Sequence, residues 1–227
     1  MLTTFLSGNV DLVGLLIQVF ALLLIIFIVL PFHEWAHAIV AYKLGDNTAK
    51  YSGRLTLNPL AHVDYIGSLM LLLVGFGWAK PVPVNPSYFK NPKVGMAITA
   101  IFGPIANIVA ALAGALIFNA VFTFWHPTFE SYQVVSYIYM FFIFYIKINV
   151  YLALFNLIPI PPLDGSKVLF MFLPNKTVSM MYQYQNFFFM GLFLLIMFGG
   201  FSNILGYLGD NVSNWVLYIT GLPFGRF

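Results

Sequence analysis

The residues best suited to chemistry in this sequence are two histidines and a glutamate within five positions. His33 and His37 are four residues apart, so on a helix they share one face and both imidazoles can bind one metal ion. Glu34 follows the first histidine, where its carboxylate can act as a general base on a water molecule without binding the metal. This spacing predicts a zinc hydrolase.

A catalytic zinc site needs a third protein ligand and one open position. The remaining histidines are His62, in a predicted loop, and His126, predicted on the opposite side of the membrane. Asp164 is a better candidate, because it is the only carboxylate in the stretch 156–165, where three prolines interrupt the helix. Irregular backbone at membrane depth is tolerated where it lines a polar cavity. We therefore expect Asp164 to complete the site.

The composition indicates that these residues belong to a membrane protein. Of the 227 residues, 61% are hydrophobic and only 7% are charged, whereas soluble domains carry about 25% charged residues. So few charges cannot give a 25.5 kDa protein a hydrated surface. This excludes a soluble enzyme, a nucleic-acid binder, a coiled coil and a disordered chain. The sequence contains no cysteine, which excludes disulfides, thiolate zinc sites and a cysteine nucleophile.

Four apolar stretches are long enough for the roughly 20 residues that a membrane-spanning helix needs. They are residues 12–33, 94–122, 131–159 and about 182–205. The sequence thus predicts an all-α polytopic membrane protein with four to six transmembrane helices. We expect a single domain over 1–227, with its core at 12–173, followed by the helix 182–205 and a tail.

One further apolar stretch, 65–79, is only 15 residues long and is punctuated by glycines. It continues into a proline-rich run ending near residue 86, so we expect a re-entrant or extended segment at about 65–86 rather than a full crossing. Asp164 can meet His33 and His37 only after an even number of further crossings. The metal hypothesis therefore requires that 65–79 does not cross the membrane.

Lysine and arginine predict the orientation, because they accumulate in cytoplasmic loops. Six of the ten lie between the first two predicted spans and two lie between the third and fourth, while the connection near 125–131 has none. We therefore expect His33 and His37 at the cytoplasmic end of the first span.

Taken together, these motifs resemble the site-2 protease family, the intramembrane zinc metalloproteases. The resemblance covers most of 31–167 and rests on motifs in family order: His33 to His37, Asn58-Pro59 with Asp64 and Gly67, Gly77 to Val84, Gly103-Pro104 with Asn107, and Asn156 to Gly165. We expect the compact form of this family, without an inserted PDZ or CBS domain.

The resemblance implies one Zn²⁺ per chain, with His33, His37 and Asp164 as its ligands and Glu34 as the catalytic base. It also implies Asn156 as a polar group near the scissile carbonyl. The expected partners are a transmembrane protein substrate and the lipid bilayer, and the expected location is a bacterial plasma membrane with the active site toward the cytoplasm.

The resemblance further implies a substrate-binding hairpin that contains Gly75, Gly77 and Trp78. Gly103, Pro104 and Asn107 lie inside the second predicted span, where small residues allow close helix packing and a buried amide can bond a neighbouring helix or the catalytic backbone. Both a structural and a functional role remain open for these three. Lys147, in the third span, has no evident partner in the sequence.

Three functions are compatible with this pattern. The leading one is regulated intramembrane proteolysis, in which the protein hydrolyses peptide bonds within or near transmembrane segments. The second is a membrane transporter or metal-ion channel that uses His33, His37 and Asp164; the lack of an inverted repeat and the presence of Glu34 argue against it. The third is an inactive relative that binds substrates without cleaving them, which the intact motifs disfavour.

Overall fold

The computed structural model describes residues 12–74, 77–124, 132–200 and 202–225, and every regular element in them is helical. In chain order these elements are α2 (Leu12–Leu24), η1 (Ile25–Val29), α3 (Leu30–Lys43), α4 (Thr48–Tyr51), α5 (Pro59–His62), α6 (Tyr65–Val74), η2 (Pro86–Tyr88), α7 (Pro92–Phe124), α8 (Tyr132–Asn156), α9 (Asp164–Phe170), α10 (Asn175–Gln183), α11 (Gln185–Met197), α12 (Ser202–Gly221) and η4 (Leu222–Phe224). The all-α prediction is confirmed for this part of the chain.

Within the described part of the chain, three helices are long and apolar enough to cross a membrane: Leu12–Lys43, Pro92–Phe124 and Gln133–Asn156. They correspond to the first three predicted spans. The first is longer than predicted, because α2, the π-helical η1 and α3 form one continuous helix of 32 residues. The His-Glu-x-x-His motif therefore lies within this helix and not at its end.

The fourth predicted span, 182–205, is wrong as a single helix. The chain forms α11 and α12 here, and α11 has only 13 residues, about 20 Å of helix against a hydrocarbon core of about 30 Å. The break lies at Gly199-Gly200, where Gly199 has a φ of +75° that a continuing helix cannot contain.

The helix in the stretch 65–79 is too short to cross a membrane, as predicted. Its helix, α6, has ten residues and is therefore about 15 Å long, half of the hydrocarbon core. The chain then continues as the segment 78–85, which has no regular secondary structure and which we call the extended segment.

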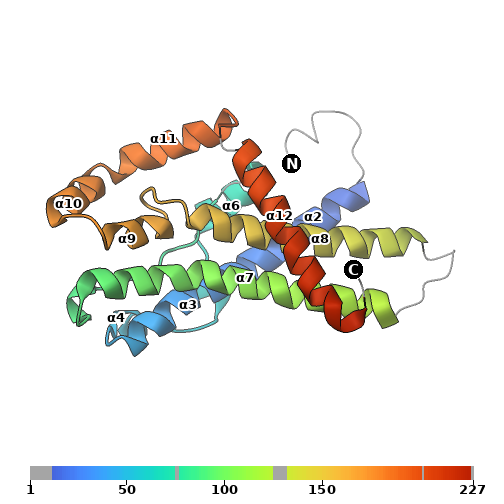
Figure 1. Cartoon of the computed structure of the whole chain (residues 1–227), viewed down its shortest axis with the longest axis horizontal. Coiled ribbons are helices and arrows are strands. Elements are labelled where there is room, and N and C mark those ends of the chain that lie inside the picture. Colours follow the sequence, from blue (N-terminus) through green and yellow to red (C-terminus); the bar gives the residue numbers. More distant parts are fainter. Residues whose placement is uncertain (1–11, 75–76, 125–131, 201, 226–227) are drawn as a thin grey trace.

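Helix α7 is the centre of the molecule and packs against α3, α8, α9 and α12. The core between α7, α8 and α12 is formed by five buried residues, Ala111, Ala115, Ile146, Val150 and Val216. The pair α10–α11 leaves this bundle, and α12 returns across α7 and α8 (Figure 1). Figure 1 also shows α4, α9 and α10 at the same end of the bundle, beside the start of α7.

Candidate metal centre

His33 and His37 lie on one face of α3, and both are buried. Their Nε2 atoms are 3.0 Å apart. Glu34, between them in sequence, is also buried. The i, i+4 spacing thus brings the two imidazoles together, as predicted from the motif.

Asp164 meets this pair from a distant part of the sequence. It is the first residue of α9, which follows the proline-rich turn after α8. Its Oδ2 lies 3.3 Å from His33 Nε2 and 3.2 Å from His37 Nε2. The three side chains offer ligand atoms within 4.8 Å of one another. The predicted meeting of Asp164 with the two histidines is therefore confirmed.

The donor set and its spacing fit a zinc ion. Zinc in proteins binds histidine nitrogen and carboxylate oxygen at about 2.0–2.1 Å in a tetrahedron, so its ligand atoms lie about 3.3–3.4 Å from one another. The separations here, 3.0, 3.2 and 3.3 Å, are close to that value. Three protein ligands also leave the fourth position that a catalytic zinc needs.

Neighbouring groups hold two of these side chains in place. The Nδ1–H of His37 donates to the Thr99 carbonyl at 2.7 Å, because a carbonyl can only accept, and this directs Nε2 toward the cluster. The ammonium of Lys167 donates to Asp164 Oδ1 at 2.9 Å, which leaves Oδ2 to face the imidazoles. Such contacts fix the orientation of metal ligands.

The charges around Asp164 favour its ionised form. Burial by itself raises the pKa of this carboxyl, but His37 and Lys167, through their charges, and hydrogen bonds from both histidines hold the pKa well below its usual range. Burial likewise lowers the pKa of Lys167, and Asp164 outweighs that effect and raises it. The half-buried lysine and the buried aspartate therefore stay charged as a pair.

Glu34 links the motif to the extended segment. The backbone N–H of Val82 donates to Glu34 Oε2 at 2.9 Å. Arg54 holds the segment nearby, since its Nη2 donates to the carbonyls of Lys80 at 2.6 Å and Pro81 at 2.8 Å. At the far end, the Asn85 N–H donates to Asp46 Oδ2 at 2.7 Å. Asp46 and Arg54 are buried and were not among the predicted site residues.

Comparison with known families agrees with this geometry. The sequence model of peptidase family M50 matches residues 21–198. The chain belongs to this family. It is a zinc metalloprotease of the M50 type, as the resemblance to the site-2 proteases predicted.

Three relatives share the name "Putative zinc metalloprotease". YwhC of Bacillus subtilis is 39% identical over 68% of this chain and 70% of its own. Rip2 of Mycolicibacterium smegmatis is 29% identical over 59% of this chain and 49% of its own. MJ0611 of Methanocaldococcus jannaschii is 32% identical over 61% of this chain and 63% of its own. No solved structure matches the chain.

In this M50 protease Gly103 lies directly against the metal cluster. A Cβ at this position would be 2.4 Å from His37 Nε2 and 2.6 Å from His33 Cε1, so a larger residue would displace the imidazoles. Pro104 is buried beside it. Asn107 lies one turn further along the same face of α7; it is fully buried, and neither its Nδ2 nor its Oδ1 has a partner among the described residues.

Two of the three predicted substrate-binding residues, Gly77 and Trp78, lie at the start of the extended segment. Gly75 is outside the described residues. Gly77 packs against α6, because a Cβ there would be 2.1 Å from the Gly67 carbonyl oxygen. The Trp78 side chain is 40% exposed, and its ring meets Phe189 of α11 edge to face at 6.4 Å. The tight backbone contact gives Gly77 a structural role that the sequence pattern did not indicate.

The predicted residue Asn156 and the rejected ligand candidate His62 both make their side-chain hydrogen bonds outside the cluster. Asn156 ends α8, and its Nδ2 donates to the Leu152 carbonyl at 3.0 Å, within its own helix. His62 is fully buried, and its Nε2 lies 2.7 Å from the Thr56 carbonyl oxygen, away from the three ligands. His126 is outside the described residues.

Gly165, next to Asp164, must be a glycine, because a Cβ there would be 2.1 Å from the Leu157 carbonyl oxygen.

Proposed function

We propose that the protein is an intramembrane protease that hydrolyses peptide bonds within or near the transmembrane segments of other membrane proteins. One observation carries this proposal: His33 and His37 of the buried cluster, with Glu34 between them, lie on a helix long and apolar enough to cross a membrane, and Asp164 meets them there. A hydrolytic site at that depth has little use for soluble substrates. It suits a peptide chain that is itself in the membrane.

The ligands we propose for the zinc ion are His33, His37 and Asp164. When bound, zinc supplies Lewis acidity, which acidifies water and polarises a carbonyl oxygen. Lys167 and the Thr99 carbonyl then act on the ligands: one holds Asp164 ionised, and the other fixes the tautomer of His37. Their role is to keep the three donor atoms converged before any substrate arrives.

Glu34 is the residue we propose as the general base. Its Oε2 accepts from the Val82 N–H, and its Oε1 has no hydrogen bond among the described residues. That free oxygen can accept the proton of the attacking water and later give it to the amine that leaves. The bond from Val82 fixes the carboxylate while the reaction proceeds.

A substrate helix must be unwound before it can be cut, because its carbonyls are shielded and already bonded. We propose that the extended segment receives the unwound chain, with Gly77 and Trp78 at its entrance. The donors it can offer are few: Lys80 and Val82 already donate, and Pro81 and Pro83 have no N–H.

The N–H groups of Ala79 and Val84 in the extended segment have no hydrogen-bond partner among the described residues. Asn156 can add another donor near the scissile carbonyl, since its Nδ2 carries two N–H groups and Leu152 accepts only one. This small number of anchors would hold a short extended stretch and release it easily after cleavage.

The expected location is a bacterial plasma membrane, with the cluster toward the cytoplasm. Lys43 ends the helix that carries the motif, and Lys93 lies in the first turn of α7, at the same end of the bundle. Basic residues at that end support the cytoplasmic orientation.

The test is metal analysis of the purified protein together with cleavage of a model transmembrane peptide in detergent. We expect one zinc per chain and cleavage by the wild type. Glu34→Gln should retain zinc and lose about 10²- to 10⁴-fold in turnover, the usual range for general-base catalysis. Zinc binding without cleavage under any condition, or metal transport that survives in Glu34→Gln, would instead indicate a transporter.

A further inference from the structure

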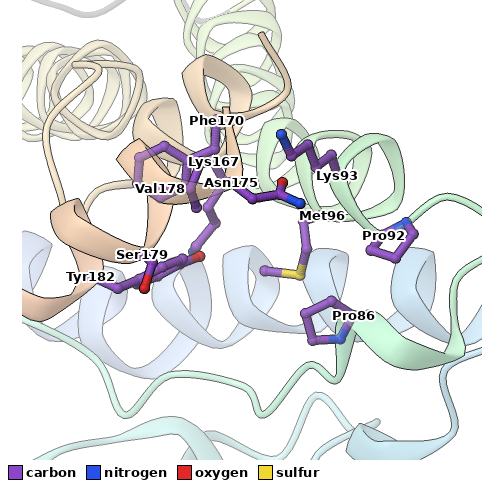
Figure 2. Close-up of a pocket in the computed structure, with 10 residues that line it drawn as sticks. All are labelled: Pro86, Pro92, Lys93, Met96, Lys167, Phe170, Asn175, Val178, Ser179 and Tyr182. Atoms are coloured by element: carbon purple, nitrogen blue, oxygen red, sulfur yellow. The ribbon is translucent and has the colours of Figure 1, made fainter. Parts of the chain in front are cut away.

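A cavity of about 380 Å³ lies beside the metal centre, between the start of α7 and the pair α9–α10 (Figure 2). Lys167 lines it and also contacts Asp164, so the cavity and the metal cluster share a wall. Pro86, which directly follows the extended segment, lines the opposite wall. A peptide that lies along the extended segment past Glu34 therefore reaches this cavity next.

The lining of the cavity is apolar with a positive rim. Met96, Phe170 and Val178 provide apolar surface, whereas Lys93 and Lys167 bring two ammonium groups. None of the ten lining residues is acidic. Figure 2 shows Lys93 on the α7 side and Lys167 on the α9 side of the same cavity.

Both lysines have donors to spare. Lys167 gives one N–H to Asp164, and Lys93 gives one to the Leu173 carbonyl, while an ammonium carries three. Asp164 neutralises Lys167 in part, so Lys93, whose partner is an uncharged carbonyl, is the principal free charge. Neutral donors complete the rim: the amide of Asn175 and the hydroxyls of Ser179 and Tyr182.

The helix ends add to this positive potential. Helix α7 begins at Pro92 and α10 at Asn175, and both residues line the cavity. The first turn of a helix carries a partial positive charge. Helix α10 begins after Pro174, which has no side-chain oxygen to cap the helix. Two lysines and two helix starts thus line the same open cavity.

We propose that this cavity is a specificity site that binds an acidic side chain of the substrate, a glutamate or aspartate in the part of the substrate that extends past the extended segment. Its volume suits a side chain and short stretch of peptide but not a helix, which is about 10–12 Å wide. The apolar surface holds the methylene groups of the side chain, and Lys93 binds the carboxylate. This inference rests on the proposed protease function and names the feature of the substrate that the site selects.

The test uses dye-labelled model transmembrane peptides in neutral detergent, with glutamine at all positions flanking the apolar span. One position at a time is changed to glutamate, and the readout is the ratio of kcat/KM for the glutamate and glutamine peptides. We expect a preference for glutamate of about five- to tenfold at one or two adjacent positions, the effect of a partly exposed charge-assisted hydrogen bond. A ratio within each variant is insensitive to changes in overall activity.

The variants compare two neighbouring lysines. Lys93→Gln should bring the ratio to about one while its amide can still donate to the Leu173 carbonyl, and Lys93→Arg should keep the preference. Lys90→Gln is the matched control, because Lys90 is exposed and does not line the cavity; it should keep the wild-type ratio. Equal rates at every position, or the same loss in Lys90→Gln, would overturn the proposal.

Two further results would also overturn it. A glutamate preference spread evenly over all positions would indicate general attraction by the basic end of the protein. An effect of Lys93→Gln that appears only when phosphatidylglycerol is added would indicate a lipid phosphate in the cavity.

A binding measurement separates this inference from the proposed function. The Glu34→Gln variant does not need to cut, so its affinity for the glutamate and glutamine peptides can be compared by fluorescence anisotropy. Tighter binding of the glutamate peptide, lost in Glu34→Gln/Lys93→Gln, supports the cavity even if no peptide is cleaved. Equal affinities together with normal cleavage would reject the cavity and leave the protease function intact.

Discussion

Two lysine–aspartate pairs of nearly equal length lie in very different surroundings. Lys167 Nζ is 2.9 Å from Asp164 Oδ1, and Lys147 Nζ is 2.8 Å from Asp210 Oδ1. The side chain of Asp164 is only 8% exposed and its second oxygen faces two imidazoles, whereas the side chains of Lys147 and Asp210 are 44% and 53% exposed. The first pair orients one of the three side chains that we propose as zinc ligands. The second joins α8 to α12 at the surface of the bundle.

The glycines near each pair differ in the same way. Gly103 is confined by the imidazoles, and Gly165 is confined by the backbone of Leu157. Near the second pair, a Cβ at Gly209 would meet the ring of Tyr151, and a Cβ at Gly206 would meet nothing within 4 Å. The backbone around the metal cluster therefore cannot accept added atoms, while that around the α8–α12 contact has room or a movable side chain. The lysine–aspartate distances are nearly the same in the two pairs. What distinguishes the pairs is how tightly the surrounding backbone is packed.

Matched aspartate substitutions should produce the largest difference between the two pairs in zinc binding and turnover. Asp164→Asn keeps the size of the side chain but removes the charge and a metal-binding oxygen. We expect it to lose zinc and more than about 100-fold in turnover, beyond the 10- to 100-fold typical of residues that only support ligands. Asp210→Asn should keep one zinc per chain and wild-type turnover. Zinc retention in Asp164→Asn, measured by metal analysis after dialysis, would contradict the ligand assignment.

Matched glycine substitutions test confinement directly. Gly103→Ala places a methyl group 2.4 Å from His37 Nε2, so the imidazoles must move. We expect zinc affinity and turnover to fall about 10- to 100-fold, as when the support of a ligand is lost. Gly206→Ala should leave both unchanged and can raise helix stability by up to about 1 kcal/mol. Equal zinc affinities in the two variants, from competition with a chelator, would show that the cluster has more room than its contacts indicate.

The central part of the site could be predicted from sequence because it depends on two simple quantities. One is the spacing of the histidines along a helix, and the other is whether the number of predicted membrane crossings before Asp164 is even. His33 and His37 meet through a helical period, and Asp164 joins them because the intervening stretch is too short to cross the membrane. Neither argument needs side-chain detail. The first three spans follow from length and composition in the same way.

The supporting parts could not be predicted, because their signals are not in residue types. Thr99 contributes a backbone carbonyl, which every residue has, and it lies 62 positions from His37. Arg54 and Asp46 bind the extended segment across 26 to 39 positions. No local sequence pattern therefore marks them, apart from their charge in a sequence that has few charged residues. The fourth span was mispredicted because hydropathy does not register the positive φ of Gly199.

The smallest effects should distinguish the two lysines. Lys167→Met removes the partner that keeps Asp164 oriented and ionised, so we expect zinc affinity and turnover to fall about tenfold. Lys147→Met removes a charge at the same distance from its aspartate, yet Asp210 is exposed and has no part in the cluster. Surface substitutions of this kind change little, so turnover and zinc affinity should stay within about twofold of the wild type, with at most a small fall in Tm.

The double variant Lys147→Met/Asp210→Asn completes this comparison. If the pair only joins α8 to α12, removing both charges should restore the Tm lost in Lys147→Met, because no unpaired carboxylate remains, and turnover should be the same in all three proteins. If Lys147→Met instead reduces turnover as much as Lys167→Met while zinc stays bound, the α8–α12 contact takes part in the reaction cycle. The two pairs would then differ in where they act, at the metal or on the helices around it, and not in whether they matter for catalysis.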